Sequence, residues 1–259
     1  MDFAKFFLLP EDASLHGYKI DIIIYLIHIL MFVLFVGWGI YFIYVLFRFS
    51  KKRNPKANYH GGHGPFSTVI EVGVVVFEAV LLLGFSIPFW QSHINKAPSG
   101  DNAVEVRLVA EQFAWNIHYP GPDNLFGRVD VEFFDKANNP LGLDPNDPAG
   151  KDDFVMINQM YVPIGKPVVI HLSSKDVIHS LNIPSMRIKQ DAIPGLSIPV
   201  WFTPTKTGKY EIACAQLCGI GHYRMKGYLT VLIAEEYDAW VQEQVEAAAQ
   251  GADEDDFWN

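Results

Sequence analysis

The sequence predicts an α+β membrane protein, in which a two-helix transmembrane hairpin is followed by an all-β sandwich domain. Three observations support this fold class. Two long apolar stretches lie within the first hundred residues, short β-rich stretches separated by Pro, Gly and Asn follow them, and metal-ligand residue types lie between the last two β-rich stretches. Apolar stretches of about 18 residues or more are typical of membrane spans, and regularly spaced short strands are typical of sandwiches and barrels.

The two apolar stretches cover residues 20–47 and 69–90. As helices they are about 42 Å and about 33 Å long, whereas the hydrocarbon core of a bilayer is about 30 Å thick. We therefore expect both stretches to cross a membrane. Residues 20–92 then form the hairpin, and residues 1–19 form an external segment that precedes it.

The connection between the two spans indicates their orientation. Residues 48–66 contain five Lys and Arg and no acidic residue. The positive-inside rule places this loop in the cytoplasm and both termini on the outer face. The first residues lack the basic segment, apolar core and cleavage site of a secretory signal, so we expect no cleaved signal peptide. The sequence thus predicts an integral protein of a bacterial plasma membrane, with its β-rich domain outside.

Residues 93–233 are predicted to form the external domain, and residues 234–259 a C-terminal helix that runs into an acidic tail. Residues 91–259 contain 13 Lys and Arg against 23 Asp and Glu, a balance of −10. This acidity gives no support for nucleic-acid binding and favours a basic partner, although solubility alone also produces acidic surfaces. Candidate docking residues are Asp130, Glu132 and Asp135. The clearest strand signals lie at residues 104–118, 128–134, 168–173, 197–203, 209–213 and 227–233.

The site signal lies between the last two predicted strands. The twelve residues from Cys214 to Met225 read Cys-Ala-Gln-Leu-Cys-Gly-Ile-Gly-His-Tyr-Arg-Met. Two thiols, an imidazole and a thioether are soft ligands that favour copper. A single electron-transfer copper uses one Cys, two His and a weak axial ligand, so one Cys is surplus here. Two coppers that share both sulfurs would use the surplus thiol, with a second imidazole supplied by His179.

Three other interpretations of these residues stay open. The two cysteines could form a disulfide, as in many exported proteins. Two Cys and two His could hold a structural zinc ion, although zinc gains nothing from the Met. His179 could be an ordinary core or surface residue, and it is the context Asp-Val-Ile-His-Ser that favours a metal role.

At these residues the chain resembles subunit II of the haem-copper oxidases, the cytochrome c oxidase type. The family pattern combines a His followed by Ser and a Val/Ile-Pro, a Lys-x-Asp-Ala-Ile-Pro-Gly segment, and Cys-x-x-x-Cys-Gly-x-x-His-x-x-Met. This chain carries the three parts at residues 179–184, 189–195 and 214–225. The resemblance implies a cupredoxin-like sandwich and a binuclear copper centre, called CuA.

The resemblance also implies which groups bind the copper pair. The ligands would be two imidazoles, two bridging thiolates, a thioether and one backbone carbonyl, supplied by His179, His222, Cys214, Cys218, Met225 and Gln216. The family usually has Glu in place of Gln216, and that Glu also reaches a magnesium or manganese ion at the boundary with subunit I. A neutral amide is a poorer ligand for a hard cation, so Gln216 argues against this second metal site.

Four further residues take candidate roles from the resemblance. Glu71 matches the family's Glu at the mouth of the proton pathway called K, although a carboxylate at this end of a helix could also snorkel to water without a role. Residues 111–115 resemble a family segment, Gln-Trp-Tyr-Trp, whose first Trp accepts the incoming electron. That position is Phe113 here, so electrons are expected to enter past Phe113, or by way of Trp115 or Tyr119. Core packing is the alternative role for Trp115.

As a whole, the resemblance implies the CuA-bearing subunit of a respiratory cytochrome c oxidase. It would accept electrons from cytochrome c and pass them to haem in subunit I, where oxygen reduction is coupled to proton translocation. The expected partners are subunit I, further oxidase subunits, cytochrome c and membrane lipid. Two alternatives stay open: the small subunit of a CuA-type nitric oxide reductase, and a membrane-anchored protein that binds or delivers copper.

Overall fold

The structure is a computed structural model that describes residues 9–56, 64–94, 98, 103–136 and 138–256. The chain divides into two compact units. Residues 19–96 form one unit, and residues 1–18 together with 97–259 form the other.

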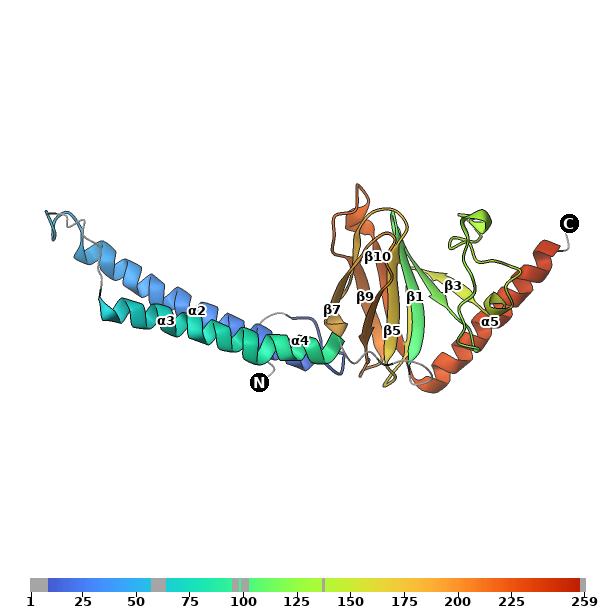
Figure 1. Cartoon of the computed structure of the whole chain (residues 1–259), viewed down its shortest axis with the longest axis horizontal. Coiled ribbons are helices and arrows are strands. Elements are labelled where there is room, and N and C mark those ends of the chain that lie inside the picture. Colours follow the sequence, from blue (N-terminus) through green and yellow to red (C-terminus); the bar gives the residue numbers. More distant parts are fainter. Residues whose placement is uncertain (1–8, 57–63, 95–97, 99–102, 137, 257–259) are drawn as a thin grey trace. The chain divides into compact units, whose positions relative to one another are not determined.

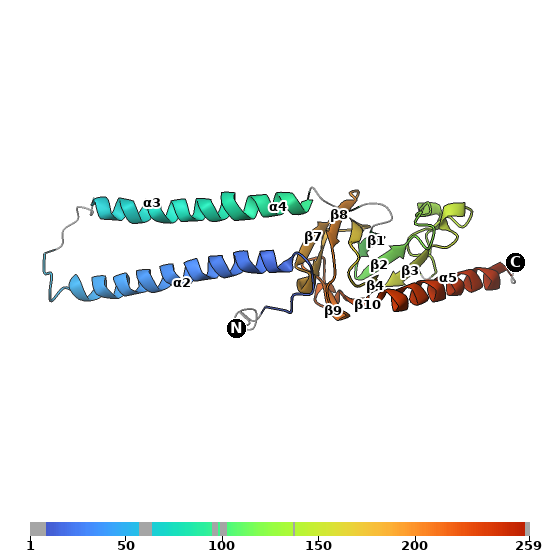
Figure 2. The same ribbon diagram turned by 90° about the horizontal axis from the view of Figure 1, so that it is seen from below.

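The first unit consists of two long helical stretches that run antiparallel (Figure 2). α2 spans Gly17–Arg48, and the second stretch passes through α3 (Pro65–Ala79), a π-helical segment (Val80–Ser86) and α4 (Ile87–Ile94). Both stretches are long and apolar enough to cross a membrane. Most of their large apolar side chains are exposed, so they need a cover of lipid or of other protein. The predicted two-helix hairpin is confirmed at the level of its helices.

The second unit is a sandwich of two five-stranded sheets (Figure 1). One sheet has the strand order β3-β2-β1-β5-β8, and the other has the order β4-β10-β9-β6-β7. Neighbouring strands are antiparallel, apart from the parallel pairs β1–β5 and β4–β10. The strands are β1 (Val104–Glu111), β2 (Ala114–Tyr119), β3 (Phe154–Ile157), β4 (Gln159–Pro163), β5 (Val168–Ser174), β6 (His179–Ile183), β7 (Ile188–Ala192), β8 (Ile198–Phe202), β9 (Gly208–Cys214) and β10 (Lys226–Leu232).

The core lies between the two sheets. Successive side chains of a strand point to opposite faces, and β1 follows this rule, with Val106, Leu108 and Ala110 fully buried and their neighbours partly exposed. Ile212 and Leu229 contribute buried side chains from the opposite sheet. The predicted all-β sandwich is therefore confirmed.

Two strand predictions were wrong. Residues 104–118 form two antiparallel strands rather than one, because the chain reverses at Gln112 and Phe113 so that Arg107 pairs with His118. Residues 128–134 form no regular strand but contain the short 3-10 helix Val131–Phe133. Its start is capped by the Asp130 carboxylate, which accepts a hydrogen bond from the Glu132 amide at 3.0 Å. Such local side-chain bonds compete with strand pairing.

Four strands were not predicted at all, namely β3, β4, β6 and β7. Each has only four or five residues, and β6 and β7 carry polar side chains such as Asn182, Lys189 and Gln190. They form because they pair with neighbouring strands: β3 pairs with β2, β4 with β10, β6 with β9, and β7 with β6. Tertiary pairing thus overrides weak local propensity.

The segment that precedes α2 is part of the β domain. Ala13 is fully buried in the core. Its amide donates to the Ser185 carbonyl at 2.8 Å, its carbonyl accepts from the Thr205 amide at 2.8 Å, and the Leu15 amide donates to the Thr203 carbonyl at 2.9 Å. We call residues 10–15 the N-terminal strap.

The C-terminal helix α5 (Ala234–Asp256) packs on the β domain through aromatic side chains. The Trp240 ring stacks on Tyr161, with centroids 4.5 Å apart, and meets Tyr119 and Phe154 edge-on. α5 continues to Asp256, so the start of the predicted acidic tail is helical.

Candidate metal centre

The predicted metal-binding residues lie in the connection between β9 and β10. Cys214 ends β9, and Met225 directly precedes β10. The loop is closed at its base, because the Cys214 amide donates to the Met225 carbonyl at 3.2 Å and the next pair in the ladder is Lys226 with Ala213. We call residues 214–225 the metal loop.

The sulfur and imidazole groups of this loop form one cluster. The Sγ atoms of Cys214 and Cys218 are 3.9 Å apart. Nδ1 of His222 lies 3.6 Å from the Cys218 sulfur, and Sδ of Met225 lies 3.7 Å from the same sulfur. Nδ1 of His179 lies 3.9 Å from the Cys214 sulfur. Donor atoms of His179, Cys214 and Cys218 all lie within 4.8 Å of one another.

His179 joins the cluster because β6 is hydrogen-bonded to β9. Leu181 of β6 pairs with Cys214, and the amide of Ala215 donates to the Ser180 carbonyl at 2.9 Å. The backbone carbonyl of Gln216 lies 3.1 Å from the Cys214 sulfur, and its side chain is exposed. All six ligands that the sequence analysis named thus lie together.

Asp176, which the sequence analysis did not single out, orients His179. Its Oδ1 lies 2.9 Å from Nε2 of His179, and its carboxylate also accepts from the amides of Gln112 and Val177, both at 2.7 Å. Burial acts to raise the pKa of Asp176, but these hydrogen bonds outweigh it and lower the pKa. A carboxylate on one imidazole nitrogen leaves the other free as a metal ligand. Asp176 precedes His179 by three residues, and this spacing is the sequence feature from which its role could have been predicted.

The distances within the cluster suit a bound metal ion. Cys218 is buried, and burial together with the neighbouring Cys214 sulfur raises the pKa of the Cys218 thiol to about 11, so a metal ion has to displace the thiol proton. Both cysteines are free thiols. A tetrahedral first-row ion separates two sulfur ligands by about 3.8 Å and a sulfur from a nitrogen ligand by about 3.5 Å. The separations of 3.9, 3.6 and 3.9 Å fit such bonds, and the thioether adds a soft ligand that suits copper.

The two aromatic candidates for electron entry occupy different environments. Phe113 is partly buried, and its ring lies against the metal loop: a Cβ atom on Gly221 would be 2.4 Å from the ring, and one on Gly219 would be 3.2 Å from it. Trp115 is fully buried and meets the His179 ring edge-on, with centroids 6.3 Å apart. The burial of Trp115 favours its alternative role in core packing. Tyr119 is also buried, at the opposite end of β2.

Gln112 ties the β1–β2 turn to the metal loop. Its side-chain amide donates to the Cys218 carbonyl at 2.6 Å, and its backbone amide donates to the Asp176 carboxylate at 2.7 Å. Glu71 lies in the other unit, on α3, where its carboxylate accepts a hydrogen bond from the Ser67 hydroxyl at 2.8 Å.

The fold and the cluster together define a class: a membrane protein with two apolar helices and a β-sandwich domain, whose last hairpin carries a Cys, His and Met site suited to copper. Comparison with known proteins identifies the family. The family model described as "Cytochrome C oxidase subunit II, periplasmic domain" matches residues 105–231.

Relatives extend this match along the chain. The alternative cytochrome c oxidase subunit 2 of Bradyrhizobium diazoefficiens is 34% identical over 79% of this chain and 73% of that protein. Cytochrome c oxidase subunit 2 of Cereibacter sphaeroides is 29% identical over 78% of this chain and 68% of that protein. The crystal structure of the periplasmic domain of subunit II of cytochrome oxidase of Bradyrhizobium japonicum is 28% identical, covering 60% of this chain and 100% of that one with a TM-score of 0.44.

The chain belongs to the cytochrome c oxidase subunit II family. It is a subunit of a haem-copper oxidase in the respiratory chain. The β domain lies outside the membrane that its two apolar helices anchor it to.

Proposed function

We propose that this subunit accepts single electrons from a cytochrome c at a binuclear copper centre and passes them to haem in subunit I, where oxygen reduction drives proton translocation. One observation carries the proposal: the two imidazoles face different sulfurs of a close thiol pair. Nδ1 of His179 faces Cys214, and Nδ1 of His222 faces Cys218. When bound, a copper pair supplies a one-electron acceptor and donor.

The distribution of ligands favours two metal ions over one. The weak ligands are divided in the same way as the imidazoles, since the Gln216 carbonyl lies beside Cys214 and the Met225 thioether beside Cys218. Each sulfur therefore has one imidazole and one weak ligand of its own. A single structural zinc would leave the thioether and the carbonyl unused.

The chain's own residues hold this ligand set in place. The closed base of the metal loop, the bond from Gln112 to Cys218 and the bond from Asp176 to His179 each restrain one ligand-bearing segment. Outer contacts of this kind fix ligand orientation. A site whose ligands stay in place when its charge changes loses little energy to reorganisation, which suits electron transfer.

The surface of the metal loop is suited to docking. Leu217, Ile220 and Tyr223 project from it with 76%, 95% and 86% of their surface exposed. Exposed apolar groups of this size mark protein interaction sites. We propose that cytochrome c and the neighbouring oxidase subunit cover them, with Phe113 beneath the loop on the path of electron entry.

Acidic residues lie near the same end of the domain. Lys175 bonds to the Glu111 carboxylate and to the Pro140 carbonyl, and its ammonium lies over the Phe134 ring at 4.9 Å. These contacts hold the loop of residues 128–140 beside the β1–β2 turn, which also contacts the metal loop. The exposed Asp130 and Glu132 on this loop would attract a basic donor.

In the helical unit, we propose that Glu71 admits protons from the inner side and that both termini lie outside. Intramembrane acids are costly, and Glu71 matches the family's Glu at the mouth of the proton pathway called K, whereas Glu78 has no such match. The Glu71→Gln variant should slow proton uptake by the assembled oxidase, whereas Glu78→Gln, a change of the same kind one or two turns away, should not. Equal effects of the two changes would leave Glu71 without a specific role.

The copper proposal is tested on the purified full-length chain by metal analysis and electron spin resonance. We expect two coppers per chain, with one unpaired electron coupled to both nuclei. Replacement of Met225 by Leu should shift the reduction potential and the spectrum, whereas Met160→Leu, which changes a buried Met outside the cluster, should alter neither. One zinc per chain, or one copper with an electron confined to it, would refute the binuclear assignment.

The second metal site of the family is tested in the assembled oxidase. The exposed Gln216 side chain offers a neutral amide where a hard cation needs a carboxylate. We expect no stoichiometric manganese after growth in manganese, and its appearance in the Gln216→Glu variant. Stoichiometric manganese in the unmodified protein would show that other residues hold this site.

A further inference from the structure

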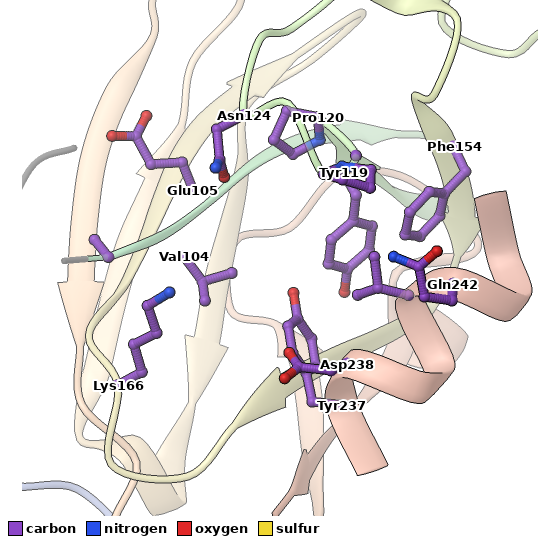
Figure 3. Close-up of a pocket in the computed structure, with 14 residues that line it drawn as sticks. Val104, Glu105, Tyr119, Pro120, Asn124, Phe154, Lys166, Tyr237, Asp238 and Gln242 are labelled. Atoms are coloured by element: carbon purple, nitrogen blue, oxygen red, sulfur yellow. The ribbon is translucent and has the colours of Figure 1, made fainter. Parts of the chain in front are cut away.

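A cleft of about 250 Å³ lies between α5 and the end of the first sheet at which β1 and β3 begin and β2 ends (Figure 3). The cleft and the metal loop lie near opposite ends of β1. This strand begins at Val104 in the cleft and ends at Glu111, beside the β1–β2 turn that contacts the metal loop. No role proposed above uses this cleft.

One part of the cleft wall is apolar. It combines aromatic, proline and valine side chains from β1, β2, the turn after β2, β3 and α5, namely Val104, Tyr119, Pro120, Pro122, Phe154 and Val241. The ring of Tyr119 is fixed, because its hydroxyl donates to the Tyr161 carbonyl at 3.0 Å and accepts from the Tyr161 amide at 2.7 Å. This wall offers flat apolar surfaces to the carbon skeleton of a ligand.

The remaining lining is polar, and its groups are not used by the fold. Lys166 reaches the cleft from the β4–β5 connection, while Tyr237, Asp238 and Gln242 reach it from the first turns of α5 (Figure 3). Within the part of the chain that the structure describes, these four side chains and that of Asn124 have no hydrogen-bond or ion-pair partner; Tyr237 is half-buried and the other four are exposed to solvent. An apolar pocket with a few convergent polar groups is the usual form of a ligand site.

The charges of these groups restrict the class of ligand. Lys166 and Asp238 carry opposite charges, and the Glu105 carboxylate at the rim lies 3.1 Å from the His171 imidazole. A ligand of either net charge would thus meet a group of its own sign. Burial and the neighbouring Asp238 raise the pKa of Tyr237, so its phenol stays a neutral hydrogen-bond donor.

The size of the cleft and its mixture of polar groups restrict the class of ligand further. Drug-sized ligands need pockets of about 300–1,000 Å³, so this cleft suits something smaller. The amides of Asn124 and Gln242 both donate and accept, the ammonium and phenol donate, and the carboxylate accepts. Hydroxyl groups, which do both, match such a lining best. We propose that the cleft binds a neutral polyhydroxylated compound the size of a monosaccharide.

The proposal is tested on the full-length chain, in a detergent without a sugar headgroup. The probes are glucose and N-acetylglucosamine, compared with anionic glucose 6-phosphate and zwitterionic serine, by calorimetry and saturation-transfer nuclear magnetic resonance. Ligands of about a dozen heavy atoms bind with dissociation constants on the order of 1 mM. We expect one of the two neutral sugars to bind at least about tenfold more tightly than the two charged probes.

Variants on α5 locate the site. Tyr237→Phe removes one hydroxyl and Asp238→Asn removes one charge, and each should weaken sugar binding about fivefold or more. Glu243→Gln, which removes a charge from the same helix outside the cleft, should leave binding unchanged. Metal content reports independently on the copper site and should be constant throughout. Tighter binding of serine or of the phosphate, equal losses in all three variants, or no sugar binding by a folded chain would each overturn the proposal.

Discussion

The contact between Phe113 and the metal loop can be tested by adding a single methyl group. A Cβ atom on Gly221 would lie 2.4 Å from Cδ2 and 2.6 Å from Cγ of the Phe113 ring. Carbon atoms in contact prefer separations of about 3.5–4.0 Å, so the ring or the loop must move by about 1 Å. Gly221 has φ −94°, which any residue adopts. The cost of Gly221→Ala is therefore steric, and we expect about 1–3 kcal/mol.

A double-mutant cycle separates this contact from other effects. Phe113→Ala removes the ring, after which Gly221→Ala should cost less than about 0.5 kcal/mol, which gives a coupling free energy of about 0.5–3 kcal/mol. The assay is urea unfolding of the full-length chain, followed by near-ultraviolet circular dichroism, with bound copper measured in parallel. Because His222 follows Gly221 directly, Gly221→Ala should also reduce copper retention. If Gly221→Ala costs the same with and without the Phe113 ring, the ring does not support the loop.

Three further substitutions probe the domain away from the cluster. Met186→Ala should lower the free energy of unfolding by about 2–5 kcal/mol, because Met186 is fully buried in the core; a loss below 1 kcal/mol in urea unfolding would contradict that packing. Tyr119→Phe removes the hydroxyl that serves both the amide and the carbonyl of Tyr161, and should cost about 1–3 kcal/mol, with no loss expected if water replaces it. Lys206→Gln breaks a solvent-exposed pair with Glu11 and should leave the Tm unchanged, since exposed pairs contribute little.

The ligands were the most predictable part of the molecule. Five of the six lie within twelve residues, where spacing alone limits their separation, and Cys, His and Met have few other reasons to occur together. His179 is more distant in sequence, and its place follows from the pairing of β6 with β9. β6 itself was not predicted, so His179 was found from its sequence context rather than from the fold.

The surroundings of the ligands were harder to predict. Asp176 and Gln112 act through hydrogen bonds that depend on two separate turns meeting at the metal loop. The turn at Gln112 was hidden within an apparently continuous strand signal from residue 104 to 118. No periodic pattern marks such contacts, because they depend on how the two sheets close against each other.

The N-terminal strap has a consequence for how this protein is made. Ala13 fills a place in the interior of a domain whose remaining residues emerge only after both apolar helices have been synthesised. Residues that precede both helices thus wait for residues that follow them before their hydrogen bonds to Ser185, Thr203 and Thr205 can form. Completion of the sandwich therefore depends on a segment from each side of the membrane anchor, and a domain produced from residue 97 onward would leave the place of Ala13 in the core unfilled.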